Sequence, residues 1–131
     1  MKAEQVVASL LNSATAVTAV VGQRIFGNVA PEQSAAPLIV YRKLGAQRVD
    51  SIDMGALAIV EARVELLIVA RSYAELKDLG EKVRLAIAYR RGTIAGIDVI
   101  DTGVDDEGPD DDDPDLREHG QSWVYMVRHS E

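Results

Sequence analysis

Cysteine is absent from this chain of 131 residues, which excludes disulfide bonds and thiolate metal sites. No segment contains about 18 uninterrupted apolar residues, the length that a membrane-spanning helix requires. Glu4 and Gln5 fall where a signal peptide would have its apolar run. The length suits one hydrophobic core, so we expect a single soluble, cytoplasmic domain over residues 1–131.

Residues that carry out catalysis are also scarce. Both histidines, His119 and His129, lie near the end of the chain, without a cysteine nucleophile or a Gly-x-Ser-x-Gly motif. The segment VVGQRIFGN has two glycines, but their spacing is not that of a phosphate-binding loop. We therefore expect no enzymatic activity, no cofactor and no small-molecule substrate.

Acidic residues are concentrated in one segment. Residues 101–118 contain ten of the 21 acids but one of the 14 bases, so the rest of the chain is nearly neutral. Within it, residues 105–118 include Pro109 and Pro114 and offer almost no apolar surface, which predicts a flexible acidic loop. The side chains expected to face a channel or a basic partner are Asp105, Asp106, Glu107, Asp110, Asp111, Asp112, Asp113 and Asp115.

The charged residues suggest two possible binding functions, for a metal ion and for a nucleic acid. The acidic loop could bind calcium or magnesium, but the ligand spacing and central glycine of an EF-hand are missing, so we favour a solvated loop without metal. Arg84, Arg90 and Arg91 could form a nucleic-acid patch, but they share their segment with several acids, which is typical of a solvated helix face. We expect no specific nucleic-acid ligand.

The clearest structural signal is a change of period at Ser72. Before it, apolar residues alternate with charged ones, which predicts a strand over residues 62–71 with one face on a core. The core-facing residues are Ala62, Val64, Leu66, Ile68 and Ala70. Leu67 and Val69 interrupt the alternation, so we expect both faces to be covered at that end.

After Ser72 the apolar residues follow helical spacing. They are Leu76, Leu79, Val83, Ala86 and Ile87. Ser72 is the expected N-cap, with Glu75 reaching back to the Ser72 amide in a capping box. Arg90 and Arg91 lie near the expected C-terminus, and Gly92 suits a left-handed C-cap.

The remaining elements are shorter. Helical segments are expected over residues 3–21, with Ser13 capping the second and Gly22 ending it, and strands over residues 24–27, 38–44, 93–104 and 121–129. Trp123 and Tyr125 share one face of the last strand, as part of the core or as a subunit contact. The order predicts an α+β domain, a mostly antiparallel sheet of about four to five strands packed against two to three helices.

The segment 45–58 reads as the polar tip of a projecting β-hairpin. Three apolar residues in it would be costly to leave in water, unless a neighbouring subunit covers them. The expected interface residues are Arg48, Asp50, Ile52, Met54 and Leu57.

Two phrases, VVGQRIFGNVAPEQSAAPLIVYRKL and ARVELLIVARSYAELKDLGEKVRLAI, together with the order of elements, carry a resemblance. They resemble the tail-terminator or tail-completion proteins of long-tailed phages and prophages, which are related to head-to-tail joining proteins. The resemblance implies a homo-oligomeric ring, usually a hexamer, that caps the tail tube and offers a docking face to the head connector or neck protein. Such a protein would assemble in the host cytoplasm and end in the virion tail, with DNA passing through the ring.

Three alternatives remain open from sequence. They are another neck or minor tail component, a monomeric bacterial adaptor module without catalytic activity, and a divalent-metal enzyme built on the acidic loop. A ring would have a mass near six times the 14.2 kDa of one chain, whereas an adaptor would not.

Overall fold

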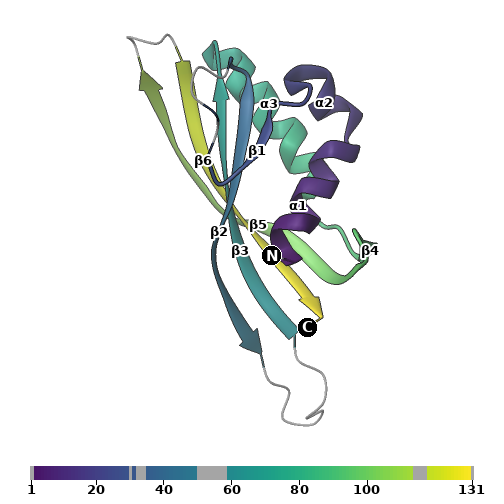
Figure 1. Cartoon of the computed structure of the whole chain (residues 1–131). Coiled ribbons are helices and arrows are strands. Elements are labelled where there is room, and N and C mark those ends of the chain that lie inside the picture. The colour runs from purple at the N-terminus through teal and green to yellow at the C-terminus, as the bar shows by residue number, and fades with distance from the viewer. Residues whose placement is uncertain (1, 30, 32–34, 50–58, 114–117, 131) are drawn as a thin grey trace.

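The computed structural model describes residues 2–29, 31, 35–49, 59–113 and 118–130. In these residues three helices lie against one face of a six-stranded sheet, as Figure 1 shows. The helices are α1 (Lys2–Ser13), α2 (Thr15–Val21) and α3 (Tyr73–Ile87). The strands are β1 (Ile25–Gly27), β2 (Leu38–Val49), β3 (Ile59–Ala70), β4 (Gly92–Ile94), β5 (Ile97–Asp113) and β6 (Glu118–Ser130). The predicted α+β class is confirmed, with slightly more strands than expected.

The strand order across the sheet is β1-β2-β3-β6-β5-β4. All ladders are antiparallel except that between β1 and β2, which is parallel. β3 is paired with β6 along its whole length and with β2 from Ile59 to Val69. It is therefore the central strand, and β2 and β3 extend past the helices toward one end of the sheet (Figure 1).

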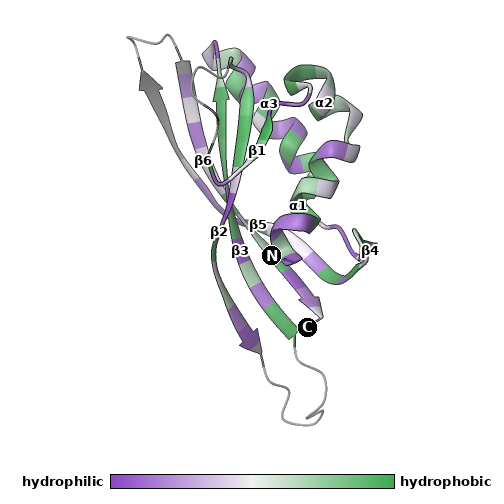
Figure 2. Cartoon of the chain, in the orientation of Figure 1, coloured by the Kyte–Doolittle hydropathy of each residue, from purple (hydrophilic) through white to green (hydrophobic). Residues whose placement is uncertain are grey.

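The core lies between the helices and one sheet face. All five predicted core residues of β3 are buried, and so are the five apolar residues predicted for α3. The helix α1 adds Ala3, Val6, Val7 and Leu11 to the same core. Figure 2 shows the apolar residues gathered where the helices meet the sheet. No single helix of the described chain is long and apolar enough to cross a membrane, although the bent pair α1 and α2 meets that test by length and composition.

Cover on both sheet faces, expected near Leu67 and Val69, is wrong. Leu67 is 37% exposed, because the helices of the described chain all lie on the opposite face. Trp123 and Tyr125, in contrast, belong to the core. Both are buried, their rings are stacked with centroids 6.1 Å apart, and an added Cβ at Gly80 of α3 would lie 3.4 Å from the Trp123 ring.

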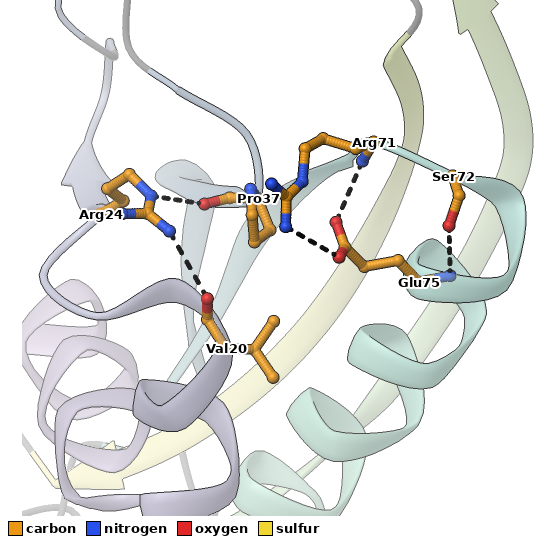
Figure 3. Close-up of polar contacts among 6 residues, drawn as sticks. All are labelled: Val20, Arg24, Pro37, Arg71, Ser72 and Glu75. Atoms are coloured by element: carbon orange, nitrogen blue, oxygen red, sulfur yellow. Dashed lines mark hydrogen bonds and ion pairs between the residues drawn. The ribbon is translucent and has the colours of Figure 1, made fainter.

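The junction between β3 and α3 has the predicted N-cap. Ser72 Oγ accepts a hydrogen bond from the Glu75 amide at 3.1 Å (Figure 3). The capping box is not formed as predicted, since the Glu75 carboxylate accepts from the Arg71 amide at 3.0 Å and pairs with the Arg71 guanidinium at 3.4 Å. At Arg71 the carboxylate gains a charged partner beside the backbone donor, which the Ser72 amide does not offer.

The other helix ends differ in detail from prediction. The helix α2 has Ala14 at its N-cap without a side-chain hydrogen bond, and Ser13 is the last residue of α1. The helix α3 ends at Ile87, and Gly92 begins β4 instead of capping the helix. Arg90 does act at the negative end of α3, where its guanidinium donates to the Ala86 carbonyl at 3.1 Å and the Leu85 carbonyl at 2.9 Å.

Arg24, from the first phrase that carried the resemblance, joins two elements. Its guanidinium donates to the Pro37 carbonyl at 2.9 Å and to the Val20 carbonyl at 3.5 Å (Figure 3). Val20 lies in α2 and Pro37 directly precedes β2, so this side chain holds the end of a helix against the start of a strand.

The flexible acidic loop predicted for residues 105–118 is wrong for most of its length. Residues 105–113 belong to β5, and the described residue Glu118 begins β6. The ladder continues from Asp106↔Val124 to Asp113↔Glu118, with register shifts that accommodate extra residues. Backbone pairing with β6 supplies hydrogen bonds that do not depend on the acidic side chains, so composition alone gave the wrong answer. Asp115 lies outside the described residues.

The cap predicts a measurable stability effect. Ser72→Ala should lower the free energy of unfolding by about 1 kcal/mol, because the Glu75 amide loses its acceptor. Ser13→Ala is the matched control, since Ser13 ends a helix and has no capping bond among the described residues. Urea denaturation followed by circular dichroism measures both. Equal losses in the two variants would contradict the assigned cap.

Tyr125 predicts a loss of stability in alkali. Burial raises the pKa of the Tyr125 phenol well above its ordinary value, and Tyr125 Oη has no hydrogen-bond partner among the described residues. The folded state therefore favours the neutral phenol. Its contribution is fully present below the unfolded pKa of about 10 and declines as pH rises above it, by up to ~1.4 kcal/mol per pH unit.

Urea titrations between pH 8 and pH 11 measure this dependence. Tyr125→Phe should have nearly wild-type stability at pH 8 and a shallower decline above pH 10, because it lacks the ionisable hydroxyl. Tyr89→Phe, which alters a phenol that is 87% exposed, is the matched control. An unchanged alkaline slope in Tyr125→Phe would show that another group causes the decline.

Candidate interaction surface

The sheet face opposite the helices carries a mixed set of apolar and charged residues. The registers Val40↔Leu67 and Arg63↔Met126 place these four side chains on that face, since paired residues share a face. Leu67 is 37% exposed, and Arg63 is 58% exposed at its side chain. No element of the described chain covers this face (Figure 1).

Ion pairs cross four strands on the same face. Arg42 of β2 bonds Glu65 of β3 at 2.9 Å, and Arg63 of β3 reaches Asp105 of β5 at 3.3 Å. A second group joins three strands, because Arg128 of β6 bonds both Glu61 of β3 and Asp101 of β5. Those two distances are 3.0 Å and 3.2 Å. The positive and negative charges on this face largely compensate one another. Such a surface suits contact with a protein, whereas DNA binding would require a surplus of positive charge.

The two long edges of the sheet are only partly covered. On one edge, β1 pairs with β2 at Ile39–Tyr41 and no further. On the other, β4 pairs with residues 97–99 of β5, and the Tyr89 amide donates to the Thr102 carbonyl at 3.0 Å. Among the described residues no strand continues either edge, so β2 beyond Tyr41 and β5 beyond Thr102 present backbone groups that another strand can bind.

Opposite charges follow these two edges. The exposed part of β2 carries Arg42, Lys43 and Arg48 and no acid. β5 carries acids and no base, and Asp105, Asp106 and Glu107 are exposed there. The backbone of residues 110–113 pairs with β6 through Gln121, Gly120, His119 and Glu118. The predicted acidic residues that are described therefore form a strand edge, and Arg48 lies on the opposite edge, paired with Val60.

The other residues of the predicted hairpin interface lie outside the described residues. They are Asp50, Ile52, Met54 and Leu57. The arms of the hairpin are longer than predicted, because β2 continues to Val49 and β3 begins at Ile59. An assembly role for the tip stays a prediction.

A groove beside β5 was not predicted from sequence. It encloses about 660 Å³ between the segment Tyr89–Arg91 and residues 101–105 of β5, with Met126 and Arg128 at its base. Tyr89 is 87% exposed and adopts φ 58°, a left-handed conformation that is uncommon for a bulky residue. A tyrosine that follows a helix has no sequence pattern that marks it as exposed, so the groove and Tyr89 become evident only from the geometry of the turn.

Metal binding has no support in the described part of the chain. No group of three or more His, Asp or Glu side chains is arranged there to hold an ion. Of the acids in β5, Asp105 is held in an ion pair by Arg63, and Asp106 and Glu107 are level with Val124 and Trp123, which lie on opposite faces of the sheet.

Comparison with known proteins gives two findings. A family described as tail completion protein gp17 matches residues 5–127, which include parts of every helix and strand. Seventeen chains of solved structures match the fold. One, from a virion of a native gene transfer agent (GTA) particle, has a TM-score of 0.72 at 12% identity and covers 96% of this chain and 92% of that chain. Among curated proteins none matches.

The ion pairs around Arg128 predict a small, salt-dependent stability effect. Arg128→Met should lower the free energy of unfolding by about 0.5–1 kcal/mol at low salt, because two partly exposed pairs are lost. The difference from wild type should shrink in 1 M NaCl. Arg91→Met is the matched control, since Arg91 has no ion pair among the described residues. A loss that salt leaves unchanged would indicate packing of the alkyl chain instead.

Proposed function

Since the chain belongs to the tail completion protein gp17 family, whose members are structural components of phage tails, we propose that it completes a tail by closing the end of the tail tube as a ring. The ring is a homo-oligomer, usually a hexamer in the proteins that the sequence resembles. Its exposed face then receives the head connector or neck protein. The protein acts after folding in the host cytoplasm and remains in the virion tail.

The observation that carries this proposal is the extent of the family match. Residues 5–127 span the helices and the sheet, so the likeness concerns the whole domain and not one shared segment. The likeness to a chain of a gene transfer agent virion also covers nearly all of both chains, which supports the same fold.

Several features of the surface suit a ring. Closed rings use heterologous contacts, in which two different surfaces of one chain meet. The two exposed sheet edges lie on opposite sides of the domain and carry opposite charge. Any acidic residues that line the central channel would repel DNA phosphates and let DNA pass without binding.

The hairpin between β2 and β3 is proposed as a second assembly element. Its arms extend past the helices (Figure 1), and its tip, residues 50–58, contains Ile52, Met54 and Leu57. With Arg48 and Asp50 these side chains would contact the next subunit or the tube end.

Assembly of tails in the presence and absence of the protein tests the proposed function. Electron microscopy should show tubes of uncontrolled length, or tubes that do not join heads, when the protein is missing. Native mass measurement of the ring released from capped tube ends should give a mass near six times the 14.2 kDa of one chain. Normal tails without the protein would reject the proposal and favour a monomeric adaptor.

The double variant Ile52→Asp and Met54→Asp tests the hairpin. It should fold, as judged by circular dichroism, and fail to cap tails. Lys82→Asp and Asp78→Lys, which exchange an exposed ion pair on α3, form the control. Normal capping by the folded hairpin variant would remove the hairpin from the assembly surface.

A further inference from the structure

We infer that neighbouring subunits join their sheets, with the exposed edge of β2 in one copy pairing with the exposed edge of β5 in the next. This contact rests on the proposed ring and specifies how its copies bind one another. The partner is a second copy of this chain.

Strand direction favours this pairing. The three ladders from β2 through β3 and β6 to β5 are all antiparallel, so β5 runs opposite to β2. Rotation about a ring axis keeps each copy the same way up. The β2 strand of the next copy would therefore be antiparallel to β5, and the new ladder would continue the pattern within each sheet.

The two edges are open at the same height. The register Arg42↔Glu65↔Val124↔Asp106 places Arg42 and Asp106 on one level. Gly45 and Gly103 are likewise level, through Arg63 and Met126. We call residues 42–45 and 103–106 the edge windows. Each begins where intrachain cover stops, because the pairing of β1 with β2 ends at Tyr41, opposite Gly27, and the Tyr89 amide donates to the Thr102 carbonyl.

The backbone groups in the windows also have matching directions. The Tyr41 carbonyl points out of the sheet edge, where it accepts from the Asn28 amide at 2.7 Å. Backbone groups of alternate residues in a strand point the same way, so the N–H and C=O of Lys43 also point outward. The Thr102 carbonyl likewise points outward and accepts from the Tyr89 amide, so the backbone N–H and C=O of Val104 point outward. Lys43 and Val104 are level through Val64 and Tyr125. They are therefore placed to exchange both backbone hydrogen bonds.

Side chains in the windows are complementary. One window contains Arg42 and Lys43 and the other Asp105 and Asp106. Each also has one exposed apolar side chain, Leu44 at 47% and Val104 at 40%. Pairing would place Arg42 level with Asp106, and it would cover both apolar side chains.

Charge also disfavours contacts between two copies through the same edge. Two β2 windows would bring Arg42 and Lys43 against their own copies, and two β5 windows would bring acids together, both of which are unfavourable. The contact is therefore heterologous, as ring closure requires.

Cysteine cross-linking tests this contact, because the chain has no cysteine of its own. The full-length double variant Lys43→Cys and Val104→Cys is oxidised with diamide on capped tail tubes and analysed by non-reducing electrophoresis. Hydrogen-bonded residues across an antiparallel ladder have Cα atoms ~5.5 Å apart, within the Cα range of a disulfide, but their Cβ atoms are ~5.5 Å apart, wider than a relaxed disulfide prefers. A short bismaleimide cross-linker is therefore used in parallel with diamide. A ladder of covalent multimers is expected.

Matched variants separate the possible contacts. Either single variant alone should give no dimer, and a mixture of the two should give dimers but nothing larger. Ser13→Cys combined with Val104→Cys is the control, since Ser13 is exposed at the end of α1 and is not part of the sheet. Dimers of Lys43→Cys alone would show two β2 edges together and overturn the proposal.

Charge exchange provides a second measurement. Lys43→Glu and Glu107→Lys alter exposed residues, which the register places on the same face and one diagonal step apart in the proposed ladder. Each single variant should require at least a tenfold higher protein concentration to form rings. The double variant should form rings at the wild-type concentration. Failure of the double variant to recover would contradict the pairing.

The oligomer of the wild-type protein on tube ends is measured first, without oxidant. Rings without cross-links in the Lys43→Cys and Val104→Cys variant would overturn the edge contact and leave the proposed function intact. Absence of any ring on the tube ends would overturn both.

Discussion

The structure depends on β3, which is paired on both sides up to Val69 and buries alternate residues against the helices. Its neighbours β2 and β6 take their register from it, and β5 takes its register from β6. The helix α3 begins directly after it through the Ser72 cap, so one continuous segment positions the sheet and its main covering helix. The relative level of the two exposed edges follows from these registers.

Sequence predicted the parts of the fold that depend on local pattern. The alternation from Ala62 to Ala70 and the helical spacing from Leu76 to Ile87 report burial on one face, and burial is what the structure has there. The boundary at Ser72 was found for the same reason, because a cap is a local hydrogen bond. The family resemblance rests partly on this strand and helix, together with the segment from Val20 to Leu44 and the order of elements, and the match over residues 5–127 confirms it.

What sequence did not give depends on partners distant in the chain. Residues 105–113 have the composition of a solvated loop, yet pairing with β6 makes them a strand. The edge windows could not be found, because a strand edge is defined by the order of the strands and not by any one of them. Glu75 binds the Arg71 amide in place of the Ser72 amide and also pairs with the Arg71 guanidinium, a choice between two neighbouring amides that the helical pattern does not show. The acids were recognised as unusual, but their arrangement along an edge required the sheet.

The strand order also has a consequence for how the chain folds. β2 with β3 and β5 with β6 are hairpins of residues close in sequence, whereas the ladder from β3 to β6 joins residues such as Leu66 and Trp123, which are far apart. Closing that long connection costs more entropy, so the hairpins should form early and meet late. Until they meet, β3 and β6 each present an unprotected apolar edge, and misfolding of newly made chains would begin there. Docking of α3, which follows β3 directly, covers the apolar face of β3, but the edge stays open until β6 pairs with it.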